Sequence, residues 1–153
     1  MNTSLQTKGA MDRWSSLSMN HADPIVIKMR DAALLASKRA YCPYSEFSVG
    51  AAVLTVDGEI YSGCNVENAS YGLTICAERN AIFQAVSGGH RNIRAVVVVT
   101  PTESPTPPCG ACRQVINEFG PDADVFVFSE GKKIMSVNMK ELLPKAFGPR
   151  NLT

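Results

Sequence analysis

The chain is organised around two short stretches, Cys76-Ala77-Glu78-Arg79 and Pro108-Cys109-Gly110-Ala111-Cys112-Arg113-Gln114. The first supplies one thiol and, two residues later, one carboxylate, and the second supplies a Cys-x-x-Cys pair directly after a proline. Three thiolates can hold a zinc ion at three corners of a tetrahedron and leave the fourth corner for water. A nearby carboxylate that is not a ligand can then move protons. The pattern therefore predicts a metal site that is open to a reacting water molecule.

Helices are predicted over residues 75–87 and 109–120, and glycine ends each of them. Both stretches therefore lie at the N-terminus of a predicted helix. Unpaired backbone N–H groups and the positive end of a helix favour anions, so each thiol should lose its proton more easily there. Arg79 and Arg113 directly follow the two motifs. We expect them to offset the negative charge of three thiolates around a divalent ion.

Strands and turns surround these helices. Asp23-Pro24 is a helix start, with Asp as N-cap and Pro at the first helical position, and this helix is predicted over 24–40. Strands are predicted over 47–55, 59–66, 94–100, 124–128 and 132–137, and a short helix over 139–143. The turns at Asp57-Gly58 and Glu130-Gly131 make antiparallel pairs, whereas a strand-helix-strand crossover makes a parallel one. The predicted fold class is α/β, a three-layer α-β-α arrangement around a five-stranded mixed sheet.

Length and composition indicate a single domain. The chain has 153 residues, a formal net charge of +1 and 19% charged residues, which suits one core and not two. We expect no nucleic-acid partner and no membrane contact, because we find neither a basic run nor an apolar run long enough to span a bilayer. Five cysteines, an odd number, and no signal-peptide pattern favour a reduced, cytoplasmic setting.

We expect two parts along the chain. Residues 1–22 have no clear periodicity and are predicted to be a disordered N-terminal tail, with a targeting segment as the alternative. Residues 23–153 are predicted to form the catalytic domain. The two histidines, His21 and His90, stand at neither ligand position and are predicted to be solvated.

The cysteines also allow other interpretations. The Cys-x-x-Cys pair alone could be a redox pair. A closed structural zinc site would need a fourth ligand, from Cys42 or Cys64, and would leave Glu78 without a purpose. Buried thiols without a metal are the third possibility.

Several motifs resemble the cytidine deaminase family and follow its order: 41–52, 63–71, 76–79, 108–114 and 142–149. The resemblance runs from about Pro24 to the C-terminus. It is to the small homotetrameric form whose zinc ligands are all cysteines. Cys42 is a departure, since a small residue such as Ala is expected there.

The resemblance implies zinc-dependent hydrolysis of cytidine and 2′-deoxycytidine to the uridine nucleosides and ammonia, a reaction of pyrimidine salvage. It implies one zinc ion per subunit, held by Cys76, Cys109 and Cys112. Zinc would lower the pKa of a bound water. Glu78 would take a proton from that water, protonate ring nitrogen N3, and pass a proton to the leaving amine.

Substrate contacts are implied in the same way. Phe47 resembles the aromatic residue that stacks on the pyrimidine, the Ala77 backbone would contact the base, and Asn65 and Glu67 would bind the ribose 3′-hydroxyl. From the residues alone, Asn65 and Glu67 could instead hold a turn at a strand end. Phe47 could equally be a core residue.

Assembly is implied by two further residues. Tyr71 and Phe147 resemble residues that reach the active site of a neighbouring subunit in a homotetramer. Either side chain could instead pack within its own chain.

Four rival functions are weaker. A blasticidin-S-type deaminase has less use for a ribose-binding Asn65-Val66-Glu67-Asn68 segment. A polynucleotide deaminase would need a basic stripe, and a dCMP deaminase would need phosphate-binding cations. From another class, a zinc-stabilised interaction module would not need Glu78.

Overall fold

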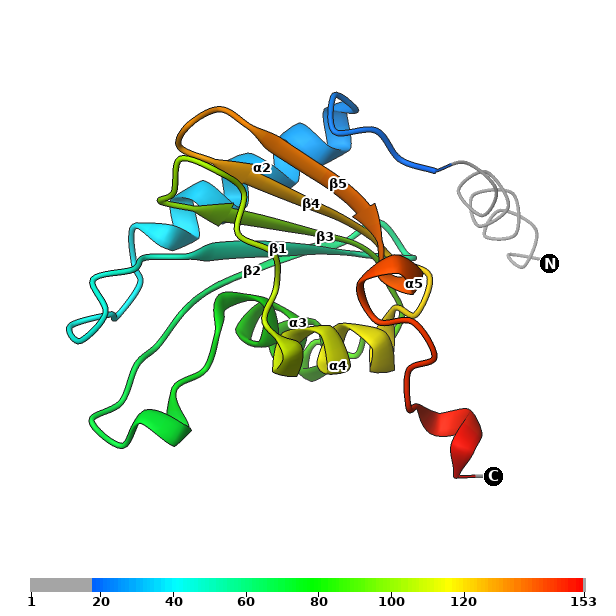
Figure 1. Ribbon diagram of the computed structural model, residues 1–153. Helices are drawn as coiled ribbons and strands as arrows, with labels where there is room; N and C mark the ends of the chain where they lie inside the picture. The colour runs from blue at the N-terminus through cyan, green and yellow to red at the C-terminus, as the bar shows by residue number, and fades with distance from the viewer. Residues whose placement is uncertain (1–17, 153) are drawn as a thin grey trace, which may run out of the picture.

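The computed structural model describes residues 18–152, so most of the predicted N-terminal tail lies outside it. The elements follow the predicted order (Figure 1): α2 (Pro24–Ser37), β1 (Gly50–Thr55), β2 (Ile60–Cys64), α3 (Ala77–Ser87), β3 (Ile93–Thr100), α4 (Gly110–Phe119), β4 (Asp124–Ser129), β5 (Ile134–Asn138) and α5 (Met139–Leu142). Two short 3-10 helices, Tyr71–Leu73 and Pro149–Asn151, were not predicted.

The five strands form one mixed sheet in the order β2-β1-β3-β4-β5. β3 and β4 are parallel, whereas the β1–β2, β1–β3 and β4–β5 pairs are antiparallel. The parallel pair arises from the crossover through α4, and two of the antiparallel pairs are the predicted hairpins. The predicted five-stranded mixed sheet is confirmed.

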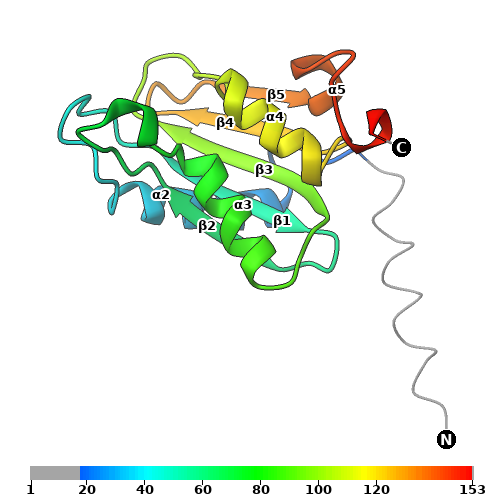
Figure 2. The same cartoon turned by 90° about the horizontal axis from the view of Figure 1, so that it is seen from below.

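Three layers are formed because both faces of the sheet are apolar. α2 covers one face, and Figure 2 shows α3 and α4 side by side on the other. Met29 and Ala33 of α2 pack with Val97 and Phe126 of the central strands. The opposite face joins strand residues to helix residues, among them Val53, Val96, Val125, Ala81, Ile82 and Ile116. Each fully buried side chain of this size contributes about 1.5–3 kcal/mol, so this burial holds both helices on the sheet.

Two glycines let helices approach the sheet closely. A Cβ atom on Gly50 would lie 1.8 Å from the carbonyl oxygen of Ala33, so α2 touches β1 there. A Cβ on Gly63 would lie 2.6 Å from the backbone nitrogen of Ala81, so α3 rests directly on β2. No side chain larger than hydrogen fits at either position without movement of backbone.

Side chains of α3 also bind the backbone of β2. Asn80 Nδ2 donates to the carbonyl oxygen of Cys64 at 2.8 Å, and Gln84 Nε2 donates to that of Ser62 at 2.9 Å. Glycine contact and amide hydrogen bonds together fix the position of α3 on the sheet.

Two predicted boundaries were wrong by three residues, for the same physical reason. The strand predicted over 47–55 begins at Gly50, because the Asn65 side chain occupies the backbone groups of Phe47 and Val49. The helix predicted over 24–40 ends at Ser37, because the backbone of Tyr41 pairs with Asn65 and Glu67. Long-range partners replace the local hydrogen bonds in both places.

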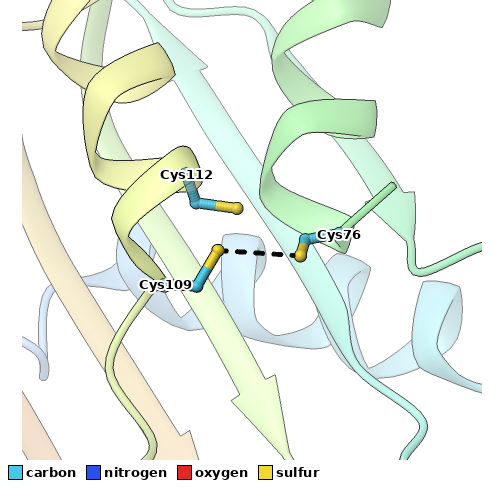
Figure 3. Close-up of side chains that lie close together, drawn as sticks. All are labelled: Cys76, Cys109 and Cys112. Atoms are coloured by element: carbon cyan, nitrogen blue, oxygen red, sulfur yellow. Dashed lines mark hydrogen bonds between the residues drawn. The ribbon is translucent and has the colours of Figure 1, made fainter. Parts of the chain in front are cut away.

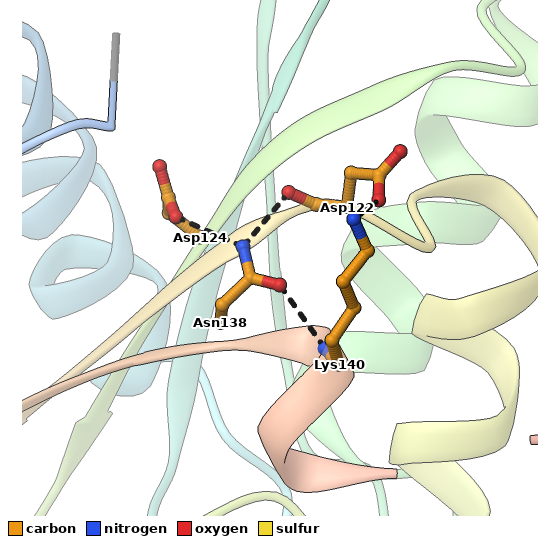
Figure 4. Close-up of polar contacts among 4 residues, drawn as sticks. All are labelled: Asp122, Asp124, Asn138 and Lys140. Atoms are coloured by element: carbon orange, nitrogen blue, oxygen red, sulfur yellow. Dashed lines mark hydrogen bonds and ion pairs between the residues drawn. The ribbon is translucent and has the colours of Figure 1, made fainter. Parts of the chain in front are cut away.

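Asn138 joins the end of the sheet to α5, as Figure 4 shows. Its Nδ2 donates to the carbonyl oxygen of Asp122 at 3.0 Å and to Asp124 Oδ1 at 3.2 Å. Its Oδ1 accepts from the backbone N–H of Lys140 at 3.1 Å. The side chain of Asn138 therefore caps α5 and holds it to the start of β4.

Within residues 18–152, no helix is long and apolar enough to span a bilayer. Of the two histidines predicted to be solvated, one is placed as predicted and one is not. His21 is exposed as predicted. His90 is not simply solvated, because its Nδ1 lies 3.0 Å from Asp57 Oδ2 and its ring packs on Tyr61.

Candidate metal centre and active site

The three predicted zinc ligands come together at the starts of two adjacent helices. Cys76 is the N-cap residue of α3 and Cys109 that of α4, and Cys112 lies in the first turn of α4. Figure 3 shows the three thiols facing one another between the helix ends. Their sulfur atoms all lie within 4.8 Å of one another, and those of Cys76 and Cys109 are 3.9 Å apart.

This geometry fits a zinc ion. Zn–S bonds of about 2.3 Å in a tetrahedron place two sulfur atoms about 3.8 Å apart, close to the Cys76–Cys109 separation. Neither Cys42 nor Cys64 belongs to the cluster within the described chain. A closed site with four cysteine ligands is therefore not formed, and a position remains for water.

The electrostatics of the cluster favour thiolates. A hydrogen bond from Cys112 and the nearby Arg79 guanidinium lower the pKa of Cys76 to about 5, against the effect of burial. The pKa of Cys112 is raised, because its hydrogen is shared with Cys76 and the residue is buried. Loss of the Cys76 proton is thus favoured and loss of the Cys112 proton is opposed, and binding of a divalent cation would require all three thiols to be deprotonated.

The two arginines differ in what they contact. Arg79 Nη2 donates to Cys76 Sγ at 3.4 Å, as expected of a residue that offsets thiolate charge. Arg113 instead donates through Nε to the carbonyl oxygen of Pro108 at 2.8 Å and through Nη1 to that of Leu142 at 3.0 Å. Arg113 therefore braces the loop before Cys109 against α5, and both of these bonds are to backbone oxygens.

Glu78 lies in the first turn of α3, next to the cluster but outside the group of ligand atoms. It is 5% exposed. Burial raises the pKa of its carboxyl group, a backbone hydrogen bond opposes the rise, and the negative charge of Cys76 adds to it. A buried carboxyl group with a raised pKa can hold a proton near neutral pH and release it again.

Glu67 is enclosed by the loop over residues 42–47. Its Oε2 accepts from the backbone N–H groups of Tyr44 at 2.9 Å and Ser45 at 3.2 Å, and its Oε1 accepts from the Ser45 hydroxyl. These hydrogen bonds, the one from the Ser45 side chain foremost, hold the pKa of Glu67 below its usual value. Glu67 is therefore an ionised acceptor at neutral pH.

Asn65 connects the same loop to the sheet. The residue is 8% exposed, and its Nδ2 donates to the carbonyl oxygen of Phe47 at 2.7 Å while its Oδ1 accepts from the N–H of Val49 at 2.9 Å. One amide hydrogen and one lone pair remain after these bonds. The structure thus links Phe47, Asn65 and Glu67 into one hydrogen-bonded unit.

The other predicted contact residues have very different exposure. Ala77 is fully buried at the start of α3, whereas Tyr71 is 74% and Phe147 is 59% exposed. Tyr71 packs on Tyr44 with ring centroids 5.7 Å apart. It shares a cavity of about 310 Å³ with Tyr44, Ser45, Glu67 and Thr74.

Sequence reasoning missed Ser45. Its position two residues before the predicted base-stacking Phe47 was the available signal, since Ser side chains commonly bond to backbone two residues away. Here Ser45 Oγ accepts from the N–H of Phe47 at 3.1 Å.

Comparison with known proteins agrees with this site. A family model described as "Cytidine and deoxycytidylate deaminase zinc-binding region" matches residues 25–129. That range includes the three cysteines and Glu78.

Individual relatives extend the match over most of the chain. The cytidine deaminase of Halalkalibacterium halodurans is 52% identical over 116 residues, which are 75% of this chain and 88% of that protein. The cytidine deaminase of Sporosarcina psychrophila is 50% identical over 119 residues, which are 77% of this chain and 88% of that protein. The crystal structure of cytidine deaminase from Burkholderia pseudomallei has a TM-score of 0.77 and 45% identity, and the match covers 84% of this chain and 100% of that one. The chain therefore belongs to the cytidine deaminase family.

Proposed function

We propose that this protein hydrolyses cytidine and 2′-deoxycytidine to uridine and 2′-deoxyuridine and releases ammonia. The observation that carries the proposal is the buried Glu78 carboxyl group beside three clustered thiols that leave one tetrahedral position open. Membership of a hydrolytic deaminase family supports it.

The residues of the proposed metal site have separate roles. Cys76, Cys109 and Cys112 hold one zinc ion per chain, and the Arg79 guanidinium offsets part of the thiolate charge through its bond to Cys76. The bound ion acts as a Lewis acid that lowers the pKa of water at the open position. Arg113 supports the Cys109 loop from its side of α4.

Glu78 moves the protons of the reaction. It takes one proton from the attacking water and gives it to ring nitrogen N3 while the water oxygen bonds to C4 of the cytosine. It then takes the proton of the new C4 hydroxyl group and gives it to the amino group, so that the C4–N bond breaks, ammonia leaves and the C4 carbonyl forms. Burial raises the pKa of Glu78, which is the direction expected of a carboxyl group that must carry a proton as well as release one.

The substrate contacts follow from the unit around loop 42–47. Phe47 packs against the pyrimidine, and the backbone of Ala77 contacts the base. Asn65 and Glu67 bind the ribose 3′-hydroxyl. Each side chain can form a further hydrogen bond besides those that it makes within the chain.

Assembly and context complete the proposal. Residues 23–153 form the catalytic domain, and four copies assemble with shared active sites. Tyr71 and Phe147 support this, because such exposed aromatic side chains are typical of protein interfaces. We place the enzyme in pyrimidine salvage in the cytoplasm, with nucleosides and not nucleic acids as its partners.

The alternatives are less well supported. A blasticidin-S-type deaminase is not favoured by relatives that are named cytidine deaminases. A structural zinc module would gain nothing from a buried carboxyl group beside its metal, because an unpaired buried acid destabilises the fold.

The test is ammonia release from cytidine by zinc-loaded protein, with Glu78→Gln measured alongside. We expect turnover by the wild type and a loss of about 10²- to 10⁴-fold in the variant, as for removal of a general acid–base group. Glu118→Gln, the same change on the exposed face of α4, is the control and should keep full activity.

Two outcomes would contradict the proposal. Absence of turnover from zinc-loaded wild type would point to another cytosine-ring substrate, with blasticidin S the first to try. Near-normal turnover by Glu78→Gln would remove Glu78 from the proton transfers.

A further inference from the structure

The Ser45 side chain forms hydrogen bonds to two parts of the candidate substrate site. Its hydroxyl donates to Glu67 Oε1 and accepts from the backbone N–H of Phe47 at 3.1 Å. A serine hydroxyl has a single hydrogen to donate. Because that hydrogen is committed to Glu67, the direction of both bonds is fixed.

The neighbouring backbone is held in a conformation that it would not adopt without support. Glu46 has a φ of 55°, in the left-handed region that non-glycine residues rarely adopt. The hydrogen bond from Glu46 N–H to the carbonyl oxygen of Cys42, at 2.9 Å, closes the turn before it. The bond between Ser45 Oγ and Phe47 N–H spans Glu46 and fixes the turn after it.

Phe47 is consequently held at both ends of its backbone. Its N–H is bonded to Ser45, and its carbonyl oxygen accepts from Asn65 Nδ2 at 2.7 Å. Its ring packs against the hydrophobic core beneath α3. Ser45 and Asn65 therefore together hold the backbone that carries the ring.

Glu67 is fixed by the same loop. A carboxylate offers about four acceptor positions, and three of them are used by Tyr44 N–H, Ser45 N–H and the Ser45 hydroxyl. The remaining capacity can only accept a hydrogen bond. Loss of the Ser45 hydroxyl would free Oε1 to turn away from its present position.

We propose that Ser45 is a positioning residue that couples the sugar-side carboxylate of Glu67 to the base-side ring of Phe47, and so determines specificity for nucleosides that carry a 3′-hydroxyl. This inference rests on the proposed function, since it concerns binding of the same nucleoside. It assigns to Ser45 no direct contact with the reacting atoms. Those atoms lie with α3 and α4, which carry the three cysteines and Glu78.

The experiment compares wild type, Ser45→Ala and Ser45→Thr on cytidine and on 3′-deoxycytidine. Ser45→Ala should raise KM for cytidine about tenfold, the effect of one hydrogen bond to a charged group, and should change kcat by less than about threefold because uniform binding is lost. Ser45→Ala should raise KM for 3′-deoxycytidine much less, so the variant should prefer nucleosides with a 3′-hydroxyl less strongly than wild type does. Ser45→Thr keeps the hydroxyl and should restore KM for cytidine.

Controls separate positioning from folding. Ser48→Ala is the control, because it makes the same change at a serine that follows Phe47 in the sequence. It should leave both KM values unchanged. Ser45→Ala should keep its zinc and unfold cooperatively, with a lower thermal midpoint than wild type because the bonds to Glu67 and Phe47 are lost. An equal loss on both nucleosides, no change in KM, or loss of zinc or fold in Ser45→Ala would each overturn the inference.

The wild-type measurement distinguishes the two claims. If zinc-loaded wild type turns over cytidine and Ser45→Ala behaves identically, the inference fails and the proposed function stands. If wild type does not turn over cytidine, the proposed function fails and the inference falls with it.

Discussion

Cys76 and Glu78 are two residues apart at the start of one helix, yet their pKa values shift in opposite directions. Hydrogen bonds from Cys112 and Arg79 stabilise the Cys76 thiolate, whereas burial destabilises the Glu78 carboxylate. A metal ligand needs its charged form, and a proton carrier needs access to both forms. At the residue scale, the first turn of α3 therefore provides two different acid–base environments within one short segment.

The ligand set leads to a prediction about metal content. Cys109→Ala removes one of three sulfur ligands, so purified protein should contain well under one zinc ion per chain by elemental analysis. Cys42→Ala removes a half-buried thiol outside the cluster and should keep its zinc. Full zinc content in Cys109→Ala would reject this ligand set.

Glu67 leads to a prediction about pH. Its folded-state pKa is lowered from a usual value of 4.5, so its hydrogen bonds stabilise the fold above that value, and this stability is lost as pH falls through the folded-state pKa. The thermal midpoint of wild type should therefore exceed that of Glu67→Gln at pH 6, and the gap should close towards pH 3. Scans with a chelator present exclude effects of metal release, and a gap that widens on acidification would contradict the assignment.

At the scale of elements, the position of α3 is set by its contact with β2. Gly63 brings the strand so close to the helix that a Cβ added there would lie 2.6 Å from the nitrogen of Ala81 and 2.9 Å from the carbonyl oxygen of Ala77. Both are backbone atoms of the helix that carries Cys76 and Glu78. Movement of α3 away from the sheet would therefore displace the proposed metal ligand and the proposed proton carrier together.

Gly63→Ala tests this contact. We expect it to lower the free energy of unfolding by about 2 kcal/mol, the usual cost of overpacking, and to weaken zinc binding. Gly72→Ala is the matched control, because a Cβ there meets no atom within 4 Å, and it should be neutral or slightly stabilising. The comparison is made by urea unfolding of wild type, Gly63→Ala and Gly72→Ala. Equal unfolding midpoints would show that α3 can move away from β2 without a loss of stability.

At the scale of the whole molecule, two helix starts meet on one side of the sheet. The crossover β3-α4-β4 and the return from β2 through α3 place Cys76, Cys109 and Cys112 together, although Cys76 is far from the other two in the chain. Large aromatic side chains remain exposed on this protomer, Tyr71 at 74% and Phe147 at 59%. Burial of such side chains between copies is the physical basis for the proposed tetramer.

Light scattering tests the assembly. The molecular mass in solution should be four times the chain mass of 16.5 kDa. Phe147→Ala should lower activity and shift the mass towards smaller species, whereas Leu152→Ala, a nearby exposed apolar residue, should do neither. An active monomer would reject shared active sites.

The ease of prediction differed between parts of the site. The cluster of three cysteines was predictable because Cys109 and Cys112 are one helical turn apart and both motifs stand at helix starts, although Cys76 is distant in the chain. The roles of the two arginines were not equally predictable. Arg79 reaches back one turn to Cys76, but Arg113 is directed to Leu142 because α5 packs beside α4.

The loop over residues 42–47 marks the limit of local reasoning. Its conformation depends on Tyr41 pairing with Val66 and on the side chains of Asn65 and Glu67, which are distant in the chain and reach the loop only through the fold. The same contacts ended α2 early and delayed the start of β1. Periodicity carries no information about such pairings, so the role of Ser45 became visible only with the structure.

The bonds from Asn80 and Gln84 to β2 have a consequence for aggregation. β2 is an outer strand, and the free carbonyl and N–H groups of such a strand can pair with strands from other molecules. The carbonyl oxygens of Ser62 and Cys64 are already engaged by the amides of α3. A foreign strand would therefore meet two carbonyl acceptors of β2 that are already engaged, which disfavours growth of the sheet into fibrils from this side.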